Sequence, residues 1–129
     1  MHQPVILLLD DEADLLDVMQ TTLQHSLPEY EVVAVENIED AMHTVESLHQ
    51  SGRELALAVV DHVLGGRTGL DFIQLLNLRY PRVRKMMFTG QASAGVEFRA
   101  KKAGATVLWK PVPLSRLMGE VQRILTPPA

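Results

Sequence analysis

Four short apolar segments of this chain are each followed at once by a side chain that can handle phosphate or a metal ion. These segments, each with the polar residues after it, are 5–9 with Asp10 and Asp11, 55–60 with Asp61, 86–88 with Thr89, and 107–109 with Lys110. If the segments are parallel strands of one sheet, their carboxyl ends share one edge, where open α/β sheets carry their sites. Three carboxylates, one hydroxyl and one ammonium group would then meet there.

A cation site is indicated because Asp10, Asp11 and Asp61 are predicted to lie close together at one edge of the sheet. Two carboxylates about 4 Å apart repel by roughly 4 kcal/mol at an effective dielectric constant of about 20, which is a large fraction of a domain's stability. A bound cation relieves this repulsion. Because the chain has no cysteine and carboxylate oxygens are hard ligands, Mg²⁺ is the expected ion. The backbone carbonyl of Val63, just after Asp61, would complete the protein ligands.

The same residues are suited to phosphoryl transfer. A carboxylate can attack phosphorus and form an acyl phosphate, and Asp61 is the expected nucleophile because it stands alone after its strand. Lys110 and the cation would balance charge on the phosphoryl oxygens during transfer. The hydroxyl of Thr89 would donate to one of those oxygens once the group is attached.

Each of these residues also has a purely structural interpretation. Asp10 and Asp11 together are typical of a helix N-cap, and Thr89 before Gly90 is typical of a turn hydroxyl. Lys110 before a proline is typical of a solvated loop. The shared position at the ends of apolar strands favours the chemical interpretation.

The elements that must position these groups follow from hydrophobic spacing. Short, continuous apolar runs indicate strands that are buried on both faces, and amphipathic stretches between them indicate helices. The predicted strands are 5–9, 31–35, 55–60, 86–88 and 107–109. The predicted helices are 14–27, 37 or 39–49, 68–78, 93–103 and 114–125. Five strand–helix units imply an α/β protein with a parallel sheet and helices on both faces.

Length and composition restrict the function further. The 129 residues suit one domain, predicted over 1–126, with 127–129 as a tail or the start of a linker. A formal net charge of −4 and only a short basic segment, 79–85, which reads as a solvated turn, disfavour direct nucleic-acid binding. There is no secretory leader and no apolar run of about 20 residues, so no membrane association and a cytoplasmic location are expected.

The ordered motifs resemble the receiver domain of two-component response regulators over nearly the whole chain. The matching motifs are Asp10-Asp11, the loop from Asp61 to Gly69, Phe88-Thr89-Gly90 and Trp109-Lys110-Pro111. The resemblance implies a flavodoxin-like three-layer sandwich with strand order 2-1-3-4-5. It also implies that Asp61 accepts a phosphoryl group from a sensor histidine kinase or a phosphotransfer protein. By the same resemblance Asp10 and Asp11 bind Mg²⁺, and Thr89 and Lys110 contact the phosphoryl group.

Three features depart from that family pattern. Leu64-Gly65 stands where Met-Pro is usual, and Gly65-Gly66 should make the loop more flexible. Gly90 replaces the common alanine. Val107 stands where an aromatic residue usually moves between outward and inward states, and Trp109 is expected simply to pack beside the site.

The implied role is a phosphoacceptor signalling domain, whose catalysis is limited to its own phosphorylation and dephosphorylation. Its response would appear on the surface of the fourth helix, last strand and last helix, which is also the expected contact for an output domain or a homodimer. The alternatives are a pseudo-receiver binding module and an aspartyl-phosphate phosphatase. The first requires loss of a key residue, and the second requires an Asp-x-Asp motif that residues 10–12 lack. A flavin-binding protein would need a hydroxyl-rich loop where these acids stand.

Overall fold

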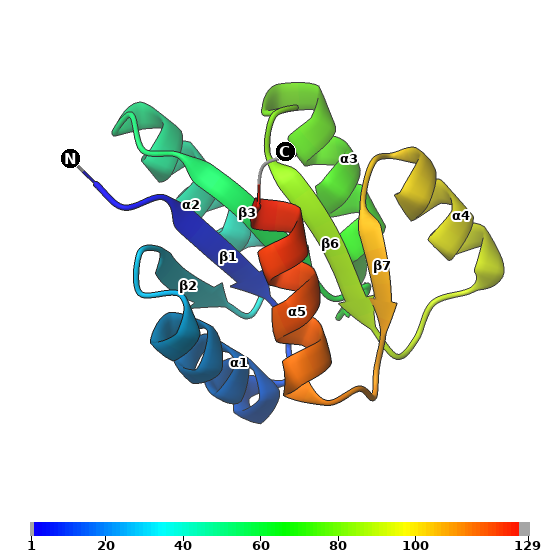
Figure 1. Cartoon of the computed structure of the whole chain (residues 1–129). Coiled ribbons are helices and arrows are strands. Elements are labelled where there is room, and N and C mark those ends of the chain that lie inside the picture. The colour runs from blue at the N-terminus through cyan, green and yellow to red at the C-terminus, as the bar shows by residue number, and fades with distance from the viewer. Residues whose placement is uncertain (1, 127–129) are drawn as a thin grey trace.

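A five-stranded parallel sheet in the order β2-β1-β3-β6-β7 forms the centre of the protein (Figure 1). The computed structural model describes residues 2–126. The strands are β1 (Val5–Leu9), β2 (Glu31–Val35), β3 (Leu55–Val60), β6 (Arg84–Thr89) and β7 (Thr106–Trp109). Because β6 and β7 are the fourth and fifth strands of this sheet along the chain, the predicted order 2-1-3-4-5 is confirmed.

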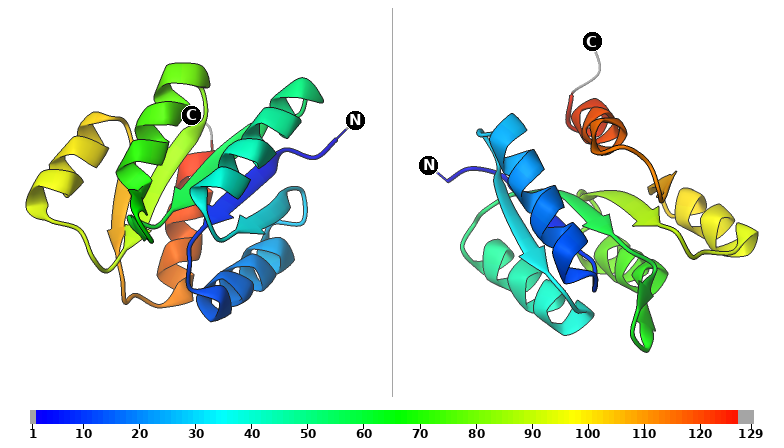
Figure 2. Two further views of the ribbon diagram at one scale, coloured as in Figure 1. Left: turned by 180° about the vertical axis from the view of Figure 1, so that it is seen from behind. Right: turned by 90° about the horizontal axis from the view of Figure 1, so that it is seen from below.

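Five helices cover the two faces of the sheet, which makes the predicted three-layer sandwich (Figure 2). One face carries α1 (Ala13–Ser26) and α5 (Leu114–Leu125). The other face carries α2 (Ile38–Gln50), α3 (Gly69–Arg79) and α4 (Ala94–Lys102).

Burial on both faces explains why the strands are continuously apolar. In β1, Ile6 and Leu8 pack toward α1 and α5, whereas Leu7 and Leu9 pack toward α2 and α3. Successive side chains of a strand point to opposite faces, so a strand between two helical layers needs apolar residues at every position. The carboxyl ends of these strands, where the polar groups lie, are therefore supported by an apolar core on each face of the sheet.

Helix boundaries lie within one or two residues of the predicted ones, and side-chain caps fix three of them. Asn37, Thr68 and Ser93 accept hydrogen bonds from backbone N–H groups in the first turns of α2, α3 and α4. Each cap satisfies an N–H group that the helix leaves unpaired. The α5 boundaries are those predicted from hydrophobic spacing.

A two-stranded hairpin that the sequence did not predict follows β3. It pairs β4 (Val63–Leu64) with β5 (Arg67–Thr68) in antiparallel register. Gly65 and Gly66 form its tip with φ angles of 58° and 97°, a backbone region that glycine adopts at little cost. Leu64 is buried in the core. The two glycines thus shape a defined turn in this structure.

The prediction of a solvated turn over 79–85 is wrong for the last residue, Lys85, which is buried in a strand. Lys85 belongs to β6 and is 7% exposed. Its ammonium group donates to the Val83 carbonyl oxygen at 2.6 Å, and burial lowers its pKa below the ordinary lysine value.

Two further predictions concern the tail of the chain and membrane association. The predicted tail, 127–129, lies outside the described residues. Within residues 2–126, none of the helices is long and apolar enough to cross a membrane.

Candidate functional site

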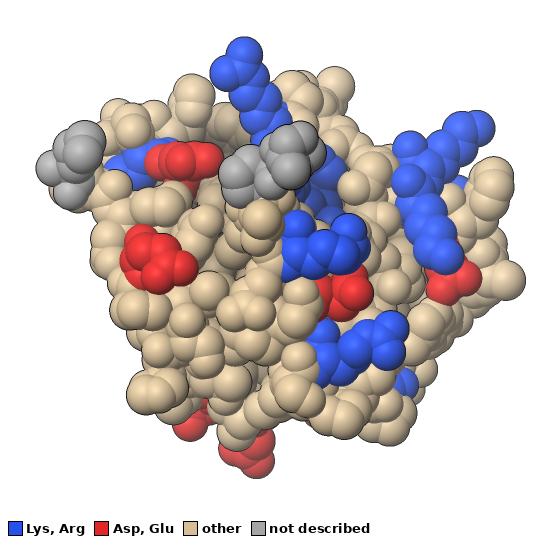
Figure 3. All heavy atoms as spheres, in the orientation of Figure 1, with Lys and Arg blue, Asp and Glu red and all other residues tan. Residues whose placement is uncertain are grey.

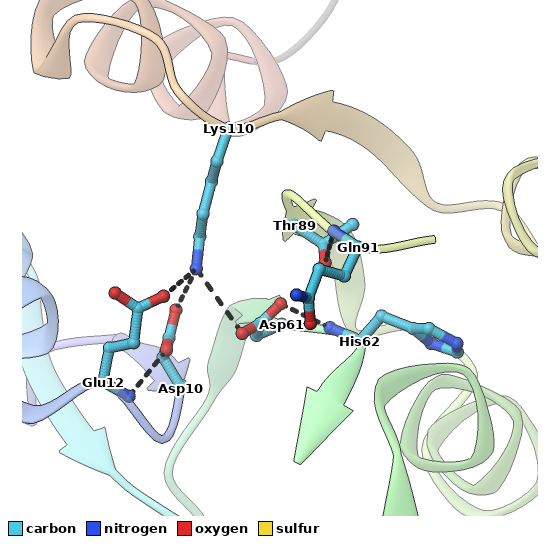
Figure 4. Close-up of polar contacts among 7 residues, drawn as sticks. All are labelled: Asp10, Glu12, Asp61, His62, Thr89, Gln91 and Lys110. Carbon is cyan, nitrogen blue, oxygen red and sulfur yellow. Dashed lines mark hydrogen bonds and ion pairs between the residues drawn. The ribbon is translucent and has the colours of Figure 1, made fainter. Parts of the chain in front are cut away.

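The ends of four strands bring the predicted polar groups together at one edge of the sheet (Figure 4). Lys110, after β7, points its ammonium group at the acids that follow β1 and β3. The Nζ atom lies 2.8 Å from Asp10 Oδ2 and 3.5 Å from Asp61 Oδ2. Three strands that are distant in sequence thus contribute to one charged cluster.

The three acids after β1 and β3 form a group that could hold a metal ion. Asp10, Asp11 and Asp61 each offer one carboxylate oxygen, and these oxygens lie within 4.8 Å of one another. Asp10 and Asp61 are buried, whereas Asp11 is exposed. Such a cluster of hard oxygen donors, without cysteine, fits a small hard cation such as Mg²⁺.

Burial and neighbouring charges shift the pKa values of Asp10 and Lys110 in opposite directions. Burial raises the pKa of Asp10 above the usual aspartate value, although the Lys110 hydrogen bond and the Glu12 backbone N–H partly offset it. Burial alone would lower the pKa of Lys110, but the hydrogen bond to Asp10 and the charges of Asp10, Asp61 and Glu12 raise it overall. The lysine is therefore held in its charged form beside Asp10, whose ionisation is made costly by burial.

The backbone around Asp61 fixes the position of its carboxylate. The Asp61 N–H donates to Leu9 O at 2.9 Å, and the His62 N–H donates to Asp61 Oδ1 at 2.8 Å. Gly69, at the start of α3, packs directly against this segment. A Cβ atom there would lie 2.1 Å from Asp61 O, so only glycine allows this approach.

Thr89 ends β6 beside the acidic cluster. Its residue is fully buried, its hydroxyl accepts a hydrogen bond from the Gln91 N–H at 3.2 Å, and its carbonyl accepts one from Lys110 N–H at 2.9 Å. In this structure the hydroxyl is engaged by the loop before α4 rather than by Asp61. Thr89 therefore links that loop to the site.

A cavity of about 750 Å³ opens over the cluster. The predicted site residues that line it are Asp11, Asp61, Val63, Thr89 and Lys110. Asp10 is not among the lining residues, and its 1% exposure places it beneath the others. The cavity gives a ligand direct access to Asp61.

Two contacts of Lys110 were missed by sequence reasoning. Glu12 Oε1 lies 3.4 Å from Nζ, and the ring of Phe88 lies 5.4 Å from it. The signal for Glu12 was present, because it follows Asp10-Asp11 within the same turn. The Phe88 contact depends on the bend of the lysine side chain, which sequence spacing does not reveal.

Val107, the departure on β7, and Trp109 two residues later both have contacts toward α4. Val107 is partly buried against the α3–α4 part of the core. The indole Nε1 of Trp109 donates to Glu97 Oε1 of α4 at 2.5 Å, and the residue is 37% exposed. Trp109 pairs with Thr89 at the end of the sheet but is not among the residues that line the cavity. Its hydrogen bond to Glu97 is a polar contact that the expectation of simple packing beside the site did not include.

Comparisons with known proteins agree with the geometry. Residues 6–122 match the model of the response regulator receiver domain family. The chain is 29% identical over 118 residues to the response regulator protein PilR of Pseudomonas aeruginosa. That alignment covers 91% of this chain and 25% of PilR, so the chain spans about a quarter of its relative's length.

Solved structures show the same fold. A CheY-like receiver domain protein from Methanospirillum hungatei superimposes with a TM-score of 0.84 at 25% identity, over 96% of this chain and 94% of that one. The non-phosphorylated HemR receiver domain of Leptospira biflexa gives 0.82 at 25% identity, over 98% and 99%. With the family match over most of its length, the chain belongs to the response regulator receiver domain family.

Proposed function

We propose that this domain is the phosphoacceptor of a two-component system and that Asp61 takes the phosphoryl group. The observation that carries the proposal is the position of the Asp61 carboxylate, which lines an open cavity 3.5 Å from the Lys110 ammonium group and within a possible cation site. The expected donor is a phosphohistidine of a sensor kinase or a phosphotransfer protein. An oxygen of Asp61 would form the new O–P bond as the P–N bond to the donor imidazole breaks.

The remaining residues would hold and balance the charge of the transferring group. Asp10, Asp11 and Asp61, with the Val63 carbonyl, would hold Mg²⁺, which when bound supplies positive charge for the phosphoryl oxygens. Lys110 is already charged and aimed at Asp61, so it would follow the new negative charge with little movement.

Phosphorylation would be read out through Thr89. The phosphoryl group adds about −1.5 to −2 charges, and a hydrogen bond from the Thr89 hydroxyl would draw in the loop before α4. Shifting a two-state population from about 1:99 to 99:1 needs about 5.5 kcal/mol. Two charge-assisted hydrogen bonds of roughly 1.5 to 3 kcal/mol each supply much of that.

We propose that the response falls on α4, β7 and α5. Because Val107 replaces the usual aromatic residue at its position, we expect the shift to be partial. An output domain that reads this surface is a further expectation, and catalysis would be confined to the domain's own phosphorylation and dephosphorylation.

Two alternative functions are less well supported. A pseudo-receiver requires a lost site residue, whereas all the predicted polar side chains are present and four of them line one cavity. A phosphatase would carry its nucleophile in an Asp-x-Asp motif, and the acids after β1 are Asp10-Asp11-Glu12. The carboxylate that is set apart in this chain is Asp61.

The test is incubation with acetyl phosphate and Mg²⁺ followed by intact-mass measurement. The unmodified protein should gain about 80 Da, the mass of one phosphoryl group, and Asp61→Asn should gain nothing. Asp14→Asn, which removes an exposed acid from the first turn of α1, is the matched control and should gain the same mass. No gain in the unmodified protein, or a full gain in Asp61→Asn, would refute the proposal.

A further inference from the structure

One neighbour of the Lys110 ammonium group is an aromatic ring rather than a carboxylate. Its Nζ atom lies over the ring of Phe88, 5.4 Å from the ring centre. The face of an aromatic ring carries negative charge density and attracts a cation. Phe88 precedes Thr89 at the end of β6 and lines the cavity over the acids, although only 3% of the residue is exposed. The contact is therefore part of the site.

Burial distinguishes this contact from the other contact of the same kind within residues 2–126. That other contact joins Lys102 to Phe98 at 5.9 Å, and Phe98 is 65% exposed. Figure 3 shows Lys and Arg side chains that project from one face of the molecule, where water competes for their charge. The Lys110 side chain is only 14% exposed. Because a cation–π contact is stronger where water is excluded, Phe88 restrains its lysine more firmly than Phe98 does.

The ring is also held in a fixed position by the core. Phe88 belongs to the core cluster on the α1 and α5 face of the sheet, which includes Leu16 and Leu117. The Glu12 carboxylate, which lies 3.4 Å from Lys110 Nζ, is 63% exposed. An exposed ion pair must order two long side chains, so it fixes their positions weakly. The buried ring therefore opposes movement of the ammonium group outward with Glu12.

We propose that Phe88 is a positioning residue for phosphoryl transfer, whose ring keeps the Lys110 ammonium group beside Asp61 before the donor arrives. The inference rests on the proposed function of Asp61. When acetyl phosphate is the donor, an Asp61 oxygen bonds to phosphorus, the P–O bond to acetate breaks, and acetate leaves with the electron pair. A cation that is already in place needs no reorientation as charge builds on the phosphoryl oxygens. A leucine at position 88 would fill the core but would offer no negative ring face.

A second buried phenylalanine separates this role from simple filling of the core. Phe72 is 0% exposed and packs in the core on the opposite face of the sheet. It does not line the cavity, and within residues 2–126 no lysine lies over its ring. Phe72→Leu therefore removes the same volume from the core as Phe88→Leu without touching Lys110. If Phe88 only filled space, the two variants would have similar effects.

The test is the rate constant of phosphorylation by acetyl phosphate at saturating Mg²⁺, followed by intact mass. Phe88→Leu should lower it about fivefold, which corresponds to about 1 kcal/mol of transition-state free energy. The Mg²⁺ dissociation constant of this variant, measured by calorimetry, should change less than about twofold because the acids stay in place. Phe72→Leu should change the rate constant less than about twofold. Phenylalanine with one, two or three ring fluorines at position 88 keeps its shape but has a weaker negative face, so the rate constant should fall with each fluorine. This series also tests the proposal if leucine disturbs folding.

Three results would overturn the proposal while the unmodified protein is still phosphorylated. The first is an unchanged rate constant in Phe88→Leu. The second is equal slowing by Phe88→Leu and Phe72→Leu, and the third is a rate constant that does not depend on fluorination; either would show that the ring acts only by filling space. No mass gain in the unmodified protein would instead refute the proposed function of Asp61, and this inference with it.

Discussion

At the scale of single residues, the site balances the cost of burying the ionised Asp10 against its attraction to Lys110. Asp10 is almost fully buried, and its hydrogen bonds to Lys110 and the Glu12 N–H do not fully offset its desolvation, because its pKa stays above the usual value. Asp10 also serves the turn before α1, since its Oδ1 accepts the Glu12 N–H at 2.9 Å. The N-cap of α1 is Glu12, and it has no side-chain cap hydrogen bond, so the interpretation of Asp10 and Asp11 as a helix N-cap is wrong; Asp10 instead supports the turn that precedes the helix.

Asp10→Asn should stabilise the metal-free protein at neutral pH. Because the folded state binds the Asp10 proton more tightly than the unfolded chain does, the ionised carboxylate costs stability at pH 7, and the cost fades as pH falls through the folded-state pKa. The free energy of unfolding measured in urea should be higher than that of the unmodified protein at pH 7, and this difference should shrink on acidification. In Mg²⁺ the order should reverse, because a ligand bound only to the folded state stabilises it. A variant less stable than the unmodified protein in metal-free buffer at pH 7 would contradict this account of the cluster.

At the scale of elements, the contact between β3 and the start of α3 sets the position of Asp61. Gly69 follows the hairpin β4–β5, and its N–H donates to the carbonyl of His62, the residue after Asp61, at 2.8 Å. The absence of a side chain at Gly69 lets α3 begin directly against the Asp61 backbone. The hairpin is thus a short connection that returns the chain to the site.

Gly69→Ala should destabilise the protein and disturb the site. Its Cβ would lie 2.1 Å from Asp61 O and 2.9 Å from Val60 Cγ1, so the backbone must shift, at a cost of about 3 kcal/mol. Gly119→Ala in α5 is the matched control, because nothing lies within 4 Å of its Cβ position. The free energy of unfolding of Gly119→Ala should rise by about 1 kcal/mol, because alanine has a better helix propensity than glycine. Equal unfolding midpoints in urea for the two variants would contradict the claim of close packing at Gly69.

Hydrophobic spacing was enough to predict five parallel strands, the five helices and the edge where the polar groups meet, whereas the strand order came from the resemblance to receiver domains. It failed where the structure depends on local turns or on tertiary burial. The hairpin at Gly65-Gly66 is two residues per strand, too short to give a periodic signal. Lys85 was assigned to a solvated turn because of its charge, whereas the sheet buries it. The link from Trp109 to Glu97 joins two elements whose relative placement no sequence spacing reveals.

At the scale of the whole molecule, the site and the α4 side are connected through the ends of β6 and β7. Thr89 joins the site to the loop before α4, and Trp109, next to Lys110, is hydrogen-bonded to Glu97 of α4. A change in the positions of Thr89 and Lys110 would reach α4 by both routes. The surface around α4 would then change when the site is phosphorylated.

Tryptophan fluorescence should report this connection, because the chain has a single tryptophan. Beryllofluoride with Mg²⁺, as a phosphoryl mimic, should loosen the Trp109–Glu97 contact and shift the emission maximum to longer wavelength as the indole meets more water. Asp61→Asn should show no shift. Unchanged emission while amide spectra report binding at Asp61 would mean that α4 does not respond.

The most direct test of the central claim is to locate the acyl phosphate by chemistry. After reaction with acetyl phosphate, borohydride reduction converts a phosphorylated aspartate to homoserine, and peptide mass spectrometry identifies the position. The account predicts homoserine at position 61 alone, and only when Mg²⁺ was present during the reaction. Homoserine at position 10 or 11, or labelling of Asp61 that is unchanged when Mg²⁺ is chelated, would contradict it.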